Sequence, residues 1–213
     1  MKIPHLISYQ DASYARRYAE TVARCRAAEE ARCDLSDGPF GRAVALQLHR
    51  LMACKDEYEV ARLHRSPALQ AEIEECFGTG ARVRYHLHPP LLRQMGLGHK
   101  LAVGPGAGVA FGVLASLRGL RESRLDPFGH TELRRAEREL RDGYELLVRR
   151  LSDSLDEQSH GRFVKIAQLP EEVRGYGPVK KAAISRFWSR LEDLDAGGGP
   201  LLGARCREGS PAG

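Results

Sequence analysis

The chain has 213 residues, 42% of them hydrophobic and 29% charged, and a formal net charge of +5 at pH 7. These values are typical of a globular protein that could form one large domain or two small ones. Basic residues alternate with Glu and Asp along the chain and are not gathered in one stripe, so nucleic-acid binding is not expected. No apolar run reaches the length of a membrane span and no signal pattern opens the chain, which predicts a cytoplasmic protein without membrane contact.

Two long helices are predicted in the first half of the chain. Asp11 is suited to cap the first helix, in which apolar and aromatic side chains recur at helical spacing from Tyr14 to Ala28. Residues 34–39 are rich in turn formers and end this helix.

A second helix is predicted to begin near Phe40. Its apolar stripe continues at helical spacing through Met52, Tyr58 and Leu63. A shorter helix at 68–77 is expected to end at the glycines that follow it.

The middle of the chain has the only strand-like pattern. Residues 82–88, RVRYHLH, alternate basic or His residues with apolar ones, and two prolines stop the pattern. Residues 91–108 are rich in glycine and predict an irregular connection, followed by a helix of small residues at 109–120.

The clearest helical period in the chain lies between 133 and 155. Residues 126–129, DPFG, have the composition of a tight turn, and Thr131 is suited to cap the helix that follows. Apolar side chains recur from Leu133 to Leu155, which predicts a long amphipathic helix with a charged outer face.

Two further helices are predicted at 160–169 and 179–194. The fold class is therefore mainly α: one domain over residues 1–195, of six or seven helices, with at most a small β element near 82–88. Residues 196–213 form a flexible tail in this interpretation.

Five cysteines occur, an odd number: Cys25, Cys33, Cys54, Cys76 and Cys206. They are scattered and never in C-x-x-C spacing, which argues against a disulfide framework, a zinc ribbon and an iron–sulfur cluster. Most are expected to be small buried side chains, whereas Cys206 is expected to be exposed in the tail.

Glycines 104, 106 and 108 invite comparison with phosphate-binding loops. The third glycine falls one residue early for the dinucleotide fingerprint, and no β-α-β context surrounds it. A turn before a helix is the favoured interpretation.

His86 and His88 would share one side of a strand, and with His99 or Cys76 they could hold zinc. Two histidines make half a site, so a structural or exposed pair is favoured. A small independent enzyme that uses these histidines remains as a minor hypothesis.

Adjacent carboxylates occur at Asp56-Glu57 and Glu171-Glu172. Neighbouring helical residues point about 100° apart, so neither pair converges on one substrate atom. Glu171 and Glu172 follow a proline at a helix start, where acids stabilise the helix dipole. No nucleophile motif is present, and no residue is assigned a catalytic role.

The stretch KDEYEVARL, residues 55–63, places charges on the face of the second helix that should pack. Burying an unpaired charge costs several kcal/mol. Three alternatives follow: the helix runs beyond the core, the charges pair internally, for instance with Arg62 or Arg174, or they meet another domain.

Four stretches in this order resemble a known family: residues 9–29, 51–64, 125–148 and 169–182. The chain is similar, from Leu6 to about Leu191, to the C-terminal helical domain of fused indolepyruvate:ferredoxin oxidoreductases, within the 2-oxoacid:ferredoxin oxidoreductase family. KDEYEVARL, LDPFG and LPEEVRGYG are the most specific pieces, because their polar residues and glycines match as well as their apolar ones. The glycine-rich 96–112 stretch and the tail after Asp195 depart from the pattern.

The resemblance implies that this domain follows domains that bind thiamine diphosphate, magnesium and iron–sulfur clusters. Such enzymes oxidatively decarboxylate aryl 2-oxoacids to acyl-CoA and reduce ferredoxin. The chain has neither a thiamine diphosphate motif nor a cluster motif, so it is expected to be non-catalytic, to hold no cofactor, and to have the catalytic domains or subunits as partners. A free-standing helical interaction module is the alternative, and the oligomeric state is left open.

The resemblance also draws attention to polar residues that periodicity does not explain. We hypothesise that segments 55–62 and 169–177 lie together, as a buried ionic network or as a surface docked on the thiamine-binding region. The candidate residues are Lys55, Asp56, Glu57, Tyr58, Arg62, Glu171, Glu172 and Arg174.

Overall fold

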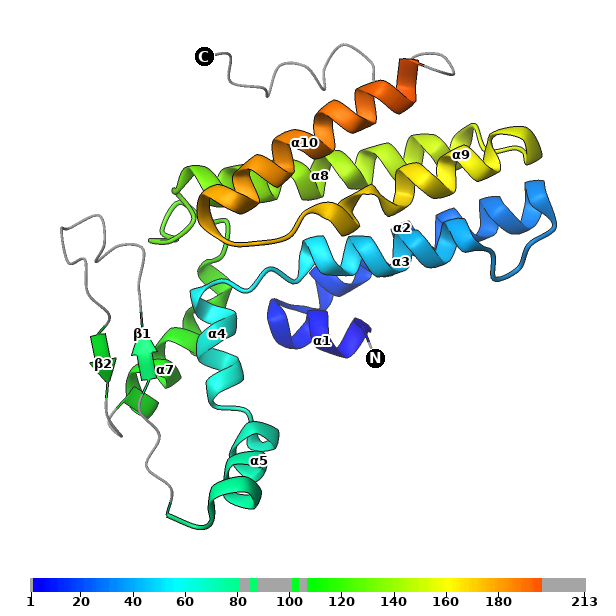
Figure 1. Cartoon of the computed structure of the whole chain (residues 1–213). Coiled ribbons are helices and arrows are strands. Elements are labelled where there is room, and N and C mark those ends of the chain that lie inside the picture. Colours follow the sequence, from blue (N-terminus) through cyan, green and yellow to red (C-terminus); the bar gives the residue numbers. More distant parts are fainter. Residues whose placement is uncertain (1, 81–84, 88–100, 104–106, 197–213) are drawn as a thin grey trace. The chain divides into compact units, whose positions relative to one another are not determined.

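The computed structural model describes residues 2–80, 85–87, 101–103 and 107–196, and these are mainly helical (Figure 1). The chain divides into two compact units. Unit 1 contains the residues up to Ala53 and those from Thr131 onward, and unit 2 is Cys54–His130. The sequence predicted one domain over 1–195, and the structure places two units within that range.

Unit 1 is an all-helical bundle. Figure 1 shows its longer helices running beside one another, in agreement with the contacts of α2 with α3 and α8, and of α8 with α10. Its elements are α1 (Lys2–Tyr9), α2 (Ala12–Cys33), α3 (Pro39–Met52), α8 (Glu132–Asp153), α9 (Glu157–Gln168), the 3₁₀ helix η2 (Leu169–Glu172) and α10 (Gly177–Ala196).

Side-chain caps set the starts of the long helices. The Asp11 carboxylate accepts a hydrogen bond from Tyr14 N at 2.8 Å, and the Thr131 hydroxyl accepts one from Arg134 N at 3.3 Å. Both predicted caps are therefore confirmed.

The start of α3 is capped from another helix. Both oxygens of the fully buried Glu29, on α2, accept backbone hydrogen bonds, from Phe40 N at 2.9 Å and Gly41 N at 2.7 Å. A Cβ atom on Gly38 would lie 2.2 Å from Glu29 Oε1, so glycine is needed there. The carboxylate also lies 2.7 Å from Nε2 of His160, on α9.

The core of unit 1 forms along the predicted stripe of α8. Leu140, Tyr144, Leu147 and Leu151 are all buried, as is Leu155 just beyond the helix end. Burying each such side chain contributes roughly 1.5–3 kcal/mol. The buried Tyr144 hydroxyl is satisfied, since it donates to the Ala167 carbonyl at 2.7 Å.

Unit 2 contains short helices and a two-stranded antiparallel sheet in which Tyr85 pairs with Val103. Ala61 of α4 and Phe111 of α7 are buried together where these two helices pack. Its elements are α4 (Glu57–His64), α5 (Pro67–Phe77), β1 (Tyr85–Leu87), β2 (Leu101–Val103), α7 (Ala107–Ser116) and the 3₁₀ helix η1 (Leu117–Leu120).

The helix count differs from the predicted six or seven, because the described residues form nine α-helices. Helix α1 was not expected, and the predicted second helix is two helices. Helix α3 ends at Met52, and Asp56 caps a new helix by accepting from Glu59 N at 2.8 Å. The prediction that one apolar stripe runs from Phe40 through Leu63 was wrong for this reason.

The helices predicted at 68–77 and 109–120 agree with the structure. The helix expected at 68–77 is α5, which ends before Gly78 at a φ of 82°, and the helix expected at 109–120 is α7 with η1. Strand β1 falls inside the predicted β element, and residues 82–84 and 88 lie outside the described residues.

Candidate functional site

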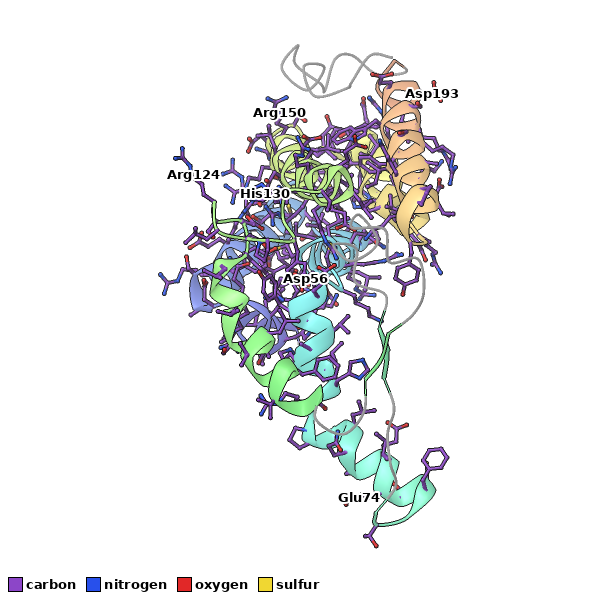
Figure 2. All side chains as sticks on the ribbon, turned by 90° about the vertical axis from the view of Figure 1, so that its left-hand side faces the viewer. Asp56, Glu74, Arg124, His130, Arg150 and Asp193 are labelled. Carbon is purple, nitrogen blue, oxygen red and sulfur yellow. The ribbon has the colours of Figure 1, made fainter. Side chains whose placement is uncertain are left out.

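Asp56 and Arg121 form a buried, bidentate ion pair within unit 2. Arg121 Nε lies 2.5 Å from Asp56 Oδ2, and Arg121 Nη2 lies 2.8 Å from Oδ1. The two residues are 8% and 7% exposed, respectively. Asp56, labelled in Figure 2, thus has two roles, since its Oδ1 also caps α4.

Tyr58 connects this pair to the loop that follows η1. Its hydroxyl donates to Asp126 Oδ1 at 3.0 Å, and its ring is 1% exposed. Arg121 Cζ lies 5.3 Å from the ring centroid, and the Phe128 ring meets it edge-on at 5.4 Å.

Asp126 in turn fixes the predicted DPFG turn. Its Oδ1 accepts from Phe128 N at 3.1 Å and its Oδ2 from Glu122 N at 3.2 Å. A Cβ atom on Gly129 would lie 2.6 Å from Asp126 Oδ2, which explains the glycine. We call Asp56, Tyr58, Arg121 and Asp126 the Asp56 cluster.

The surroundings of Tyr58 in the Asp56 cluster keep its hydroxyl protonated. Burial raises the pKa of Tyr58, and its hydrogen bond to Asp126 raises the pKa further. Tyr58 therefore remains a neutral hydroxyl that donates to a carboxylate. The Asp56–Arg121 pair, the Tyr58–Asp126 hydrogen bond and the backbone amides that donate to Asp126 together give the arrangement of a structural network.

The remaining KDEYEVARL residues lie around this cluster. Arg62 pairs with Glu59, with Nε 2.8 Å from Oε2 and Nη2 2.7 Å from Oε1, and Glu59 is 2% exposed. Lys55 is exposed, and Glu57 is half-buried in the first turn of α4, where a negative charge suits the helix dipole.

The LPEEVRGYG stretch belongs to unit 1 and is mostly exposed. Glu171 and Arg174 form an exposed pair at 3.3 Å, and Glu172 bonds to Arg190. Arg50 of α3 donates to the carbonyls of Glu171 and Val173, which ties the segment to the bundle. Segments 55–62 and 169–177 lie in different units, and the hypothesis that they lie together stays a prediction.

Sequence reasoning missed Arg121. It named Arg62 and Arg174 as partners for the KDEYEVARL charges, but the partner of Asp56 is 65 residues away in the chain. The one available signal was its place just before LDPFG, because that stretch is among the specific pieces of the resemblance.

The glycine and histidine patterns fall largely outside the described residues. This holds for Gly104, Gly106, His88 and His99, and for the side chain of His86. Within the described parts of the chain, no cluster of three or more His, Cys, Asp or Glu residues could hold a metal ion. The helices in those same parts are too short or too polar to cross a membrane.

The four described cysteines are not disulfide-bonded and lie in different surroundings. Cys25 is buried, Cys33 and Cys54 are half-buried, and Cys76 is exposed. The expectation of mostly buried cysteines therefore holds fully for Cys25 alone. Cys206 lies outside the described residues.

The family assignment rests on one comparison. No curated protein and no solved structure shows a significant match to the chain. A family model described as a family of unknown function, DUF6537, matches residues 1–193. Because this match covers most of the 213 residues, the chain belongs to the DUF6537 family.

Proposed function

We propose that this chain is a non-catalytic helical domain of an indolepyruvate:ferredoxin oxidoreductase-like enzyme. The parent reaction is the oxidative decarboxylation of aryl 2-oxoacids to acyl-CoA with reduction of ferredoxin. One observation carries the structural part of this proposal: KDEYEVARL and LDPFG, two of the three most specific pieces of the resemblance, meet in the Asp56 cluster.

These contacts explain why the residues that match the family pattern are needed, without any catalytic role. Asp56 sets the start of α4, Tyr58 bonds to Asp126, and Asp126 holds the turn. A buried ion pair adds little net stability, because desolvation offsets most of the attraction between its charges. It does penalise every arrangement that separates the partners, so it favours one defined packing of α4 against the 121–129 loop.

The third specific piece is suited to contact with a partner. Tyr176 is 80% exposed and lies between two glycines with positive φ, Gly175 at 98° and Gly177 at 52°. Val179, which follows, is 62% exposed. Tyrosine is enriched at protein–protein interfaces. In this proposal, the 169–177 segment contacts the catalytic part of the enzyme.

The proposal assigns no cofactor to this chain. Thiamine diphosphate, magnesium and iron–sulfur clusters belong to the catalytic domains or subunits, and this domain contributes shape and contact surface. Electron transfer needs a redox group, so the chain itself would not conduct electrons.

The test is to capture the native protein from the cells that express it, using an antibody to this chain. Peptide mass spectrometry, size and the visible spectrum are then recorded. A large chain or complex with the brown absorbance of iron–sulfur clusters is the expected result. A lone, colourless polypeptide of 23.6 kDa would contradict the proposal and favour the free-standing interaction module.

A further inference from the structure

Two histidines of unit 1 face one another across the contact between α1 and α3. His5 Nδ1 lies 3.0 Å from His49 Nε2, and the two ring centroids are 5.1 Å apart. Both residues are half-buried. A hydrogen bond between two imidazoles requires that one nitrogen keep its lone pair, so at least one ring must be neutral.

The charges that lower the pKa of His49 are cationic. On α1, Lys2 donates to the Ala45 carbonyl at 2.9 Å, and burial followed by the charge of Arg26 lowers its pKa. On α2, the charge of Arg26 acts on Lys2, and Arg26 Nη2 lies 3.5 Å from Asp37 Oδ1.

An aromatic ring and a further arginine also lie near His49. The Tyr18 ring, on α2, meets the imidazole edge-on at 6.1 Å, and the Tyr18 hydroxyl donates to the Ala45 carbonyl. Arg50, the next residue on α3, directs its guanidinium to the carbonyls of Glu171 and Val173. A second proton on the histidine pair would therefore be placed among positive charges.

We propose that the His5–His49 pair is an acid-sensitive contact: protonation of both rings removes their hydrogen bond, sets two cations side by side, and loosens α1 from α3. A single proton can be shared between the rings and leaves the contact intact. Opening would uncover Leu6 and Tyr9, which are 0% and 5% exposed in the closed form.

The titration of His49 determines whether acid opens or closes the contact, and over which pH range. Burial, followed by the charges of His5 and Lys2, lowers the pKa of His49 to about 4 from its ordinary value of 6.5. The closed form therefore binds fewer protons than the open form between these values. The packing of α1 against α3 is therefore most stable when the pH is above the ordinary histidine pKa. It weakens as the pH falls toward the lowered pKa of His49. Allowing for the partial exposure of the ring, linkage predicts about a tenfold rise in the opening equilibrium at a pH of about 5.

Apolar burial limits the size of the response. Leu6 and Tyr9 remain favourably buried at any pH, and the Tyr9 ring stacks on Tyr14 with centroids 6.0 Å apart. Acid is therefore expected to raise the frequency of local opening of α1 while the rest of unit 1 stays folded.

The experiment is hydrogen–deuterium exchange of the full chain at pH 7.5 and at about pH 5, corrected for the intrinsic pH dependence of exchange. We expect amide protection in α1 to fall about tenfold on acidification while protection in α8 is unchanged. The variants His49→Gln and His5→Gln each keep a hydrogen-bonding side chain without a titratable ring. His49→Gln should lose most of the response, and His5→Gln should lose part of it, because burial still lowers the pKa of His49. The exposed His130, exchanged for Gln, is the matched control and should keep it.

Three outcomes would overturn the proposal. The first is equal α1 protection at both pH values, and the second is an equal loss of protection in α1 and α8. The third is a wild-type response in both His49→Gln and His5→Gln. If one histidine variant fails to fold, the other variant decides the outcome.

Discussion

The exchange Asp56→Asn isolates the buried ion pair of unit 2. Asparagine is as good an N-cap as aspartate, so the start of α4 should survive. The change leaves the Arg121 guanidinium, 7% exposed, without its carboxylate. Breaking a buried pair by removing one partner costs about 3–5 kcal/mol. We therefore expect unit 2 to lose most of its stability.

The assay must separate the two units, because one unfolding curve would mix them. The single tryptophan, Trp188, lies on α10 in unit 1, so its fluorescence reports on unit 1. Exchange protection of the α4 amides reports on unit 2. The expected result is a large loss of protection in α4 with an unchanged urea midpoint for Trp188.

A second variant shows whether the loss of stability in Asp56→Asn comes from the buried Arg121 charge or from a general packing defect. Replacing Arg121 by Met in the Asp56→Asn background removes the buried cation that has lost the Asp56 carboxylate, so the double variant should recover a large part of the lost protection. The exposed Lys55, replaced by Gln, is the control and should change stability by less than about 0.5 kcal/mol. The reasoning is refuted if Asp56→Asn costs less than about 1 kcal/mol, or if the double variant is no more stable than the single one.

Three further predictions test the contacts one by one. Tyr58→Phe keeps the ring but removes its hydrogen bond to a buried carboxylate, so α4 protection should fall by the equivalent of about 1–3 kcal/mol; unchanged exchange would contradict that bond. Gly38→Ala puts a Cβ against the Glu29 carboxylate, so the Trp188 urea midpoint should drop with a loss of roughly 1–3 kcal/mol, and an unshifted midpoint would show that the carboxylate is not needed. Glu171→Gln breaks only an exposed pair, so the midpoint should stay within about 0.5 kcal/mol of wild type, and a larger loss would mean that the pair is not exposed in solution.

Local signals in the sequence determined the long helices of unit 1. The caps at Asp11 and Thr131 and the apolar stripe of α8 could be predicted because each depends on residues within a few positions of one another. Strand β1 and the small-residue helix near 109–120 follow from patterns of the same range, whereas β2 lies in the 91–108 stretch that was predicted to be an irregular connection.

The break between α3 and α4 needed the tertiary structure. The apolar spacing continues across residues 53–56, so periodicity alone favours one helix. The competing signal is a cap by Asp56, and it prevails because the same carboxylate is held by Arg121. Helical periodicity contains no information about a partner 65 residues away.

The chain by itself thus determined which segments are helical and which polar residues of KDEYEVARL and LDPFG needed a reason beyond periodicity. Only the tertiary structure decided what those residues do, by bringing Asp56, Tyr58, Arg121 and Asp126 together. The same holds for Glu29, whose buried carboxylate caps α3 from a different helix. Helix formation depends on neighbours in the chain, whereas the pairing of a buried charge depends on whichever segment folding places beside it.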